Sequence, residues 1–67
     1  MTAPDGYDPN YEPEAADMPA FDHAFALGGL ACICALRLAE NPFADNNQRQ
    51  AWWGGWMAAA EDLKEVN

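Results

Sequence analysis

The sequence predicts an all-α fold, in which a two-helix antiparallel hairpin follows an extended acidic N-terminal tail. First, 51% of the 67 residues are hydrophobic, too many for a wholly disordered chain. Second, two segments with helical spacing of apolar residues flank an Asn-Pro-Phe turn. Third, the first 18 residues hold three prolines and five acids but no basic residue. We therefore expect a Pro-rich tail over 1–18 and a domain over 19–67, with helices at about 20–40 and 46–65.

The tail is predicted to be extended or disordered, because prolines fix φ and remove backbone donors. Tyr7 and Tyr11 leave a second interpretation open, in which the tail is an arm that wraps the helices or a partner.

The first helix is predicted to begin near Pro19, since proline suits the first turn of a helix. Its apolar residues cover most of its circumference, and a single partner helix cannot bury so broad a surface. We expect a second subunit, or the tail folding back, to cover the remainder.

The second helix is predicted to start after the turn at Asn41-Pro42-Phe43, with Asp45 as its cap and Gln48 as the reciprocal partner. Gly28 and Gly55 each cost about 1 kcal/mol of helix propensity, which favours a close crossing of the helices there. The predicted core consists of Phe25, Gly28, Phe43, Trp52, Gly55 and Trp56. Trp53 and Met57 lie off the main stripe and are predicted either to form an apolar interface or to belong to a second buried face.

The segment from Asn41 to Trp56 resembles the ribosome modulation factor family. The resemblance rests on Asn41-Pro42-Phe43, Asn47-Gln48-Arg49 and Ala51-Trp52-Trp53-Gly54-Gly55-Trp56, and upstream on Gly28, while Cys32 and Ala35 stand where family members carry glycines. It covers about residues 28–60. It implies a two-helix fold with Phe43, Trp52 and Trp56 in the core, and a function on the ribosome during hibernation.

The charge favours a basic partner. Eleven acids against three basic residues give a net charge of -8, which repels phosphate and disfavours direct nucleic-acid binding. The candidate contacts are Asp5, Asp8, Glu12, Glu14, Asp17, Asp22, Glu40, Asp45, Glu61, Asp62 and Glu65.

No enzymatic activity, cofactor or metal site is predicted. The chain has no serine, one threonine and one histidine, and two cysteines with a lone histidine are too few ligands for a metal. The longest apolar run, over 24–36, is shorter than the ~20 residues needed to cross a bilayer, and no secretory signal is recognised. We therefore expect a cytoplasmic protein.

The leading functional hypothesis is a small phage-type inhibitor, similar to anti-CRISPR proteins, whose carboxylates mimic phosphates and occupy the nucleic-acid-binding surface of a partner, such as a bacterial defence complex. The first alternative is a ribosome-associated factor whose acids meet basic ribosomal proteins while Arg49 touches RNA. The second is a structural homodimer joined through Trp53 and Met57.

Overall fold

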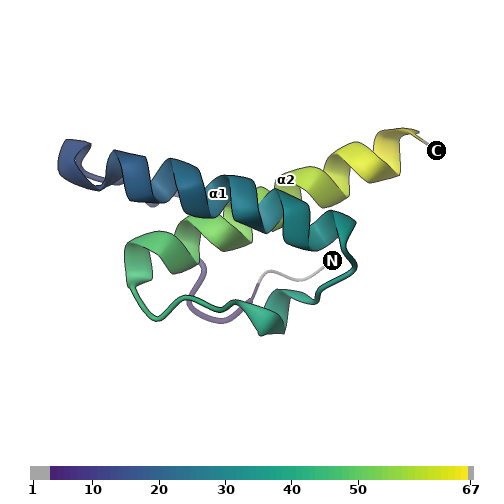
Figure 1. Ribbon diagram of the computed structural model, residues 1–67, viewed down its shortest axis with the longest axis horizontal. Helices are drawn as coiled ribbons and strands as arrows, with labels where there is room; N and C mark the ends of the chain where they lie inside the picture. The colour runs from purple at the N-terminus through teal and green to yellow at the C-terminus, as the bar shows by residue number, and fades with distance from the viewer. Residues whose placement is uncertain (1–3, 67) are drawn as a thin grey trace.

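Two helices make up most of the molecule. The computed structural model describes residues 4–66, except for the side chains of residues 65 and 66. Helix α1 (Met18–Ile33) lies across helix α2 (Asn46–Val66), and short 3-10 turns, η1 (Ala15–Asp17) and η2 (Leu38–Glu40), precede α1 and interrupt the connection (Figure 1). The part described contains no strand. The predicted all-α fold with two helices is confirmed, in a molecule measuring 37 × 21 × 21 Å.

The helices cross at two glycines, one from each. A Cβ added at Gly28 would overlap the carbonyl oxygen of Trp52, and one added at Gly55 would overlap the carbonyl oxygen of Phe25. Only glycine permits this backbone approach, so the predicted close crossing is confirmed.

Helix α1 ends earlier than predicted, at Ile33 rather than near Glu40. The Leu36 N–H donates to the Ala31 carbonyl at 2.9 Å and the Ala35 N–H to the Cys32 carbonyl at 3.0 Å, which together form a Schellman motif. Ala35 has a φ of 66°, the left-handed conformation that this motif requires and that glycine usually supplies. The sequence prediction failed because no glycine or proline marks this end.

The connection between the helices is held by side chains of α2. The indole N–H groups of Trp53 and Trp56 donate to the carbonyls of Leu38 and Leu36, at 3.1 and 2.7 Å. The Arg49 guanidinium donates to the Phe43 carbonyl at 2.9 Å and stacks 4.6 Å from the centre of the Trp53 ring. The connection is therefore fixed along α2 rather than free.

The turn before α2 closes on itself through two side chains. The Asn41 side chain accepts a bond from the Phe43 N–H at 3.0 Å and donates to the Arg49 carbonyl at 3.1 Å. The Asp45 carboxylate accepts from the Gln48 N–H at 3.2 Å, which confirms Asp45 as the helix cap. Asn41 and its proline thus position the start of α2, and they do not end α1.

The segment before α1 lies against α2. The buried Gln50 amide accepts from the Asp8 N–H at 2.8 Å and donates to the Gly6 carbonyl at 2.7 Å. Tyr7 meets Trp53 edge to face, with ring centroids 6.4 Å apart. Of the two interpretations of this segment, the structure agrees with an arm that packs on the helices. Residues 4–14 are called the arm from here on.

The core lies around the first half of α2. Trp52 and Trp53 are 2% and 4% exposed, and Phe43 and Trp56 are partly buried against them. Of the two alternatives predicted for Trp53, the buried face is confirmed and the exposed interface is not, because the arm and the connection cover its ring. The prediction of Phe25 as core is wrong: close backbone contact at Gly55 leaves the ring no room between the helices, and it is 41% exposed.

Candidate functional site

The acids of the N-terminal segment are exposed while the backbone that carries them is anchored. Gln50 binds this backbone at Gly6 and Asp8, and the buried Asn47 binds it further along, through the Asp17 carbonyl at 3.1 Å. The Tyr11 hydroxyl donates to the Asn47 side chain at 2.8 Å, and its ring stacks on Phe21. The exposed carboxylates on this anchored backbone belong to Asp5, Asp8, Glu12, Glu14 and Asp17.

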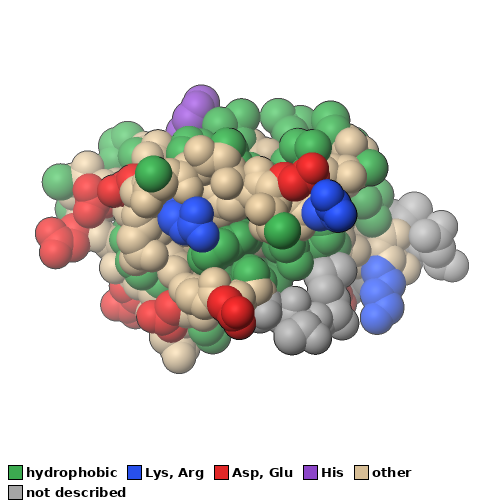
Figure 2. All heavy atoms as spheres, turned by 90° about the horizontal axis from the view of Figure 1, so that it is seen from below, with side chains coloured by type: hydrophobic (Ala, Val, Ile, Leu, Met, Phe, Trp, Pro, Cys, Tyr) green, Lys and Arg blue, Asp and Glu red, His purple; other side chains and the backbone are tan. Residues whose placement is uncertain are grey.

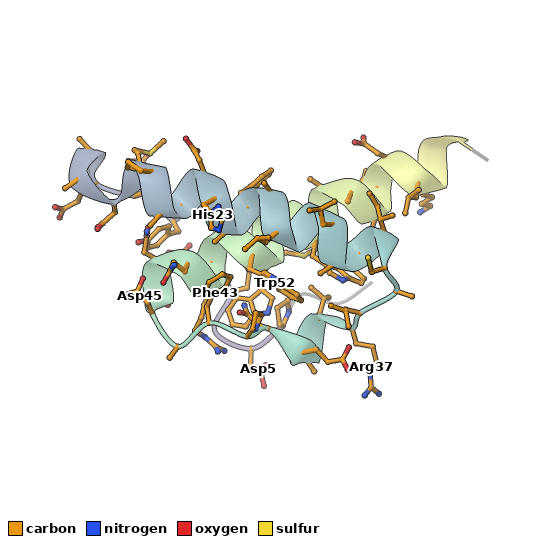
Figure 3. The ribbon with its side chains drawn as sticks, in the orientation of Figure 1. Asp5, His23, Arg37, Phe43, Asp45 and Trp52 are labelled. Atoms are coloured by element: carbon orange, nitrogen blue, oxygen red, sulfur yellow. The ribbon has the colours of Figure 1, made fainter. Side chains whose placement is uncertain are left out.

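Three acids from two elements converge at one end of the molecule. The pKa of Tyr11 is raised above 10.0, first by burial of the phenol and then by the charges of Asp17, Asp45 and Glu14. Asp45 caps α2, whereas Glu14 and Asp17 precede α1, so folding unites residues about thirty positions apart. We call Glu14, Asp17 and Asp45 the acidic end. Asp45 is labelled at the start of α2 in Figure 3, and Figure 2 shows carboxylates gathered toward the same end.

The other predicted acids do not join the acidic end. Glu40 accepts a hydrogen bond from the Arg37 N–H at 2.6 Å and lies 3.9 Å from its guanidinium. Asp22 is exposed on α1, and Glu61 and Asp62 are exposed near the far end of α2. The Glu65 side chain lies outside the residues that the structure describes.

The three basic residues do not form a groove for nucleic acid. Arg49 is engaged by the Phe43 carbonyl and the Trp53 ring, and Arg37 pairs with Glu40. Lys64 is exposed on the last turns of α2. The ribosomal alternative predicted that Arg49 contacts RNA, but its guanidinium has a structural role within the fold.

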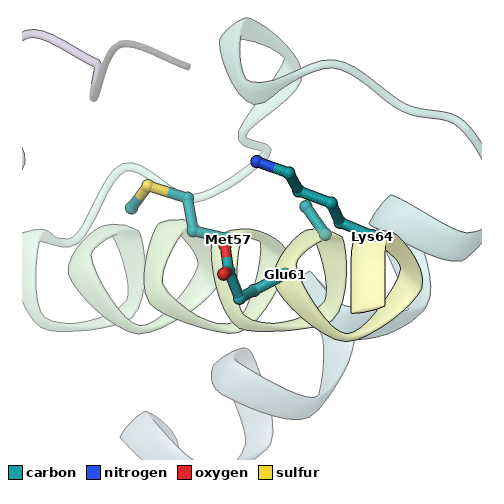
Figure 4. A pocket seen from close by; sticks show the side chains of 4 residues that line it. Met57, Glu61 and Lys64 are labelled. Atoms are coloured by element: carbon teal, nitrogen blue, oxygen red, sulfur yellow. The ribbon is translucent and has the colours of Figure 1, made fainter. Parts of the chain in front are cut away.

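Half-buried Met57 lines a hollow of about 390 Å³ with Ala60, Glu61 and Lys64 on the last turns of α2 (Figure 4). All four residues belong to one helix, and the hollow is open, so the described residues do not enclose a small-molecule site there. The hollow is lined by both apolar and charged groups. Met57 as an interface residue stays a prediction.

Sequence reasoning missed the two polar anchors of the arm. Asn47 and Gln50 are 7% and 4% exposed, yet their side chains look like ordinary surface residues of a helix in the sequence. A signal was present, because residues three apart lie on one helix face and Trp53 continues the same face. A buried amide needs partners, and here backbone of the N-terminal segment supplies them, at Gly6 and Asp8 for Gln50 and at Asp17 for Asn47.

The residues described contain no group of three or more histidine, cysteine, aspartate or glutamate side chains that could hold a metal ion. Neither helix, over the residues described, is long and apolar enough to span a bilayer. No protein-family model matches the chain, no curated protein matches its sequence, and no solved structure matches its fold. The likeness to the ribosome modulation factor family stays a prediction.

Proposed function

We propose that this protein is a non-catalytic inhibitor that presents carboxylates to a basic, nucleic-acid-binding surface of a partner protein. The observation that supports the proposal is that Asn47, two residues after Asp45, binds both the Tyr11 hydroxyl and the Asp17 carbonyl, while the Asp17 N–H binds the Glu14 carbonyl. Three acids are thereby carried on anchored backbone at one end of the molecule. A phage-type antagonist of a bacterial defence complex, similar to anti-CRISPR proteins, is the class that fits this chemistry.

Anchoring matters because disordered acids lose conformational entropy when they bind. The hydrogen bonds of Gln50 and Asn47 order this backbone when the chain folds. The backbone that carries the carboxylates therefore loses little further entropy when a partner binds. With a net charge of -8, the whole molecule also accelerates encounter with a positively charged surface, and this effect weakens as salt is added.

The ribosome-associated alternative is less well supported. Direct contact with RNA phosphates needs available cations, and the guanidinium of Arg49 is stacked and hydrogen-bonded within the fold. A negatively charged surface could bind basic ribosomal proteins, and the affinity capture described next would identify ribosomes as the partner.

The test is affinity capture from bacterial lysate at low and raised salt, followed by titration of the captured partner. The test variant carries Glu14→Gln, Asp17→Asn and Asp45→Asn, which remove three charges while asparagine keeps a capping oxygen at position 45. The control carries Asp22→Asn, Glu61→Gln and Asp62→Asn, the same change of charge on exposed positions elsewhere.

We expect the test variant to bind at least about tenfold more weakly, and the control to change affinity by less than about threefold. Nucleic acid should compete with the wild-type chain for the captured partner. Equal binding by the two triple variants would reject the acidic end as the contact, and capture of intact ribosomes would favour the alternative.

A further inference from the structure

Helix α1 places small residues toward α2 and large apolar residues toward solvent. Ala24, Gly28 and Ala31 are buried at the crossing. Leu27, Leu30 and Ile33 are 37%, 57% and 65% exposed. A surface helix of a monomer normally has the opposite arrangement, with large apolar residues in the core and polar residues outside. The outer surface of α1 thus carries the side chains that a covered surface would carry.

Two of these exposed residues, Leu27 and Leu30, also lie on the spacing of a helix-pairing seam. Along α1 and its C-cap Cys34, a row of residues follows alternating steps of three and four residues, which is the heptad pattern. The residues at these steps are Ala20, His23, Leu27, Leu30 and Cys34, and we call them the outer seam. Every one of them is exposed. His23 is labelled on α1 in Figure 3.

The outer seam is separate from the acidic surfaces. Asp22 is the only acidic residue in α1, which contains no lysine or arginine, and it does not belong to the outer seam. The arm, Asp45 and the last turns of α2 hold most of the other acids. Two chains with a net charge of -8 each therefore meet with the least repulsion when their α1 helices face one another.

A lipid surface fits this helix poorly. Helices that lie in a membrane interface carry lysine and arginine beside their apolar face, and α1 contains neither. Anionic lipids would also repel a chain with this net charge.

We propose that a second copy of this chain covers the outer seam, so that the protein forms a symmetric dimer through α1. The contact is isologous, since the same residues of the outer seam face each other from both copies. A helix of 16 residues is about 24 Å long, so the interface is smaller than a standard one and we expect a dissociation constant on the order of micromolar.

The experiment is sedimentation velocity on the full chain from about 1 to 500 µM, with reductant present because Cys34 is exposed in the outer seam. We expect the mass to rise with concentration from 7.3 kDa to twice that value. Leu30→Glu should remain at the single-chain mass across the range, whereas Ala44→Glu, which adds the same charge on the exposed connection, should dimerise like the wild type.

Three results would overturn the proposal: a wild-type chain that stays at 7.3 kDa at the highest concentration, a Leu30→Glu variant that still dimerises, or loss of the dimer in Ala44→Glu. If Leu30→Glu fails to fold, judged by circular dichroism, Ile33→Glu replaces it, because Ile33 is 65% exposed beside the outer seam. The dimer does not depend on the proposed inhibition: the triple variant of the acidic end should dimerise at least as well as wild type.

Discussion

The two helices differ in a way that their compositions conceal. Helix α1 is the more apolar, with Asp22 and His23 as its only polar side chains, yet it is covered on one side only. Helix α2 contains asparagine, glutamine and arginine in its first turns, yet α1, the arm and the connection all pack against its first half. In this molecule a side chain is buried where backbone groups bind it or where the two helices approach closely, and not simply where the sequence is most hydrophobic.

This difference shows how so small a chain specifies its fold. The centre of α2 contains three tryptophans that pack large surfaces, and its amides and indoles bind backbone of two irregular segments. Helix α1 contributes small residues and one close crossing. The stability of the monomer therefore depends mostly on α2, and the unused apolar surface lies on α1.

The largest expected effect concerns the crossing. Gly28→Ala places a methyl group on the Trp52 carbonyl, so the helices must separate, and we expect a loss of about 3 kcal/mol in the free energy of unfolding. Chemical denaturation followed by tryptophan fluorescence measures this loss.

The neighbouring glycine is the matched control. A Cβ at Gly29 meets nothing closer than the Gly55 carbonyl oxygen at 3.8 Å. Gly29→Ala should therefore leave stability unchanged or raise it by up to about 1 kcal/mol. Equal losses in the two variants would show that helix α1 does not depend on close approach at Gly28.

The next effect concerns the arm as a cover for α2. Gln50→Leu leaves the Asp8 N–H and the Gly6 carbonyl without a partner, which should cost about 2 kcal/mol or release the arm. Hydrogen exchange at the Asp8 amide reports release directly. Gln48→Leu, on the same helix but without a side-chain bond to the arm, should keep the slow exchange of wild type.

A gain is expected at the end of α1. Ala35 adopts a left-handed φ of 66°, so Ala35→Gly should stabilise the chain by about 1 kcal/mol in thermal unfolding. Ala44→Gly, elsewhere in the connection, should lower stability slightly, because glycine there adds only freedom to the unfolded chain. A loss at both positions would mean that the Schellman motif does not form.

The smallest effect is a pH dependence at the acidic end. The pKa of Tyr11 is raised by burial and then by Asp17, Asp45 and Glu14, so the unfolded chain releases this proton at lower pH than the folded one. The stabilisation is complete below pH 10 and is lost as the pH rises through the raised pKa. Phenolate absorbance in a Tyr7→Phe background follows Tyr11 alone.

Asp17→Asn with Asp45→Asn should bring the pKa of Tyr11 closer to 10.0. The control, Asp22→Asn with Asp62→Asn, removes the same charge and should shift the pKa of Tyr11 less. An unchanged titration in the first pair would place these carboxylates away from the phenol.

The elements with strong local signals were predictable from the sequence. Pro19 lies in the first turn of α1, Asp45 caps α2, and Gly28 and Gly55 mark the crossing, each through chemistry confined to a few residues. The end of α1 was missed, since an alanine in a left-handed conformation has no sequence signature. The burial of Trp53 was left undecided, because it depends on Tyr7 and Leu38, which are distant along the chain.

The bonds from Gln50 to the arm also set the order of events during synthesis. Gly6 and Asp8 precede their partner Gln50 by 44 and 42 residues, so this early segment has no docking site until the first turn of α2 has been made. At about 5–20 residues per second, that interval is roughly 2–9 s. During it, the arm and the apolar α1 emerge without their cover. The nascent chain is then most open to chaperones, to proteases and to other copies of itself.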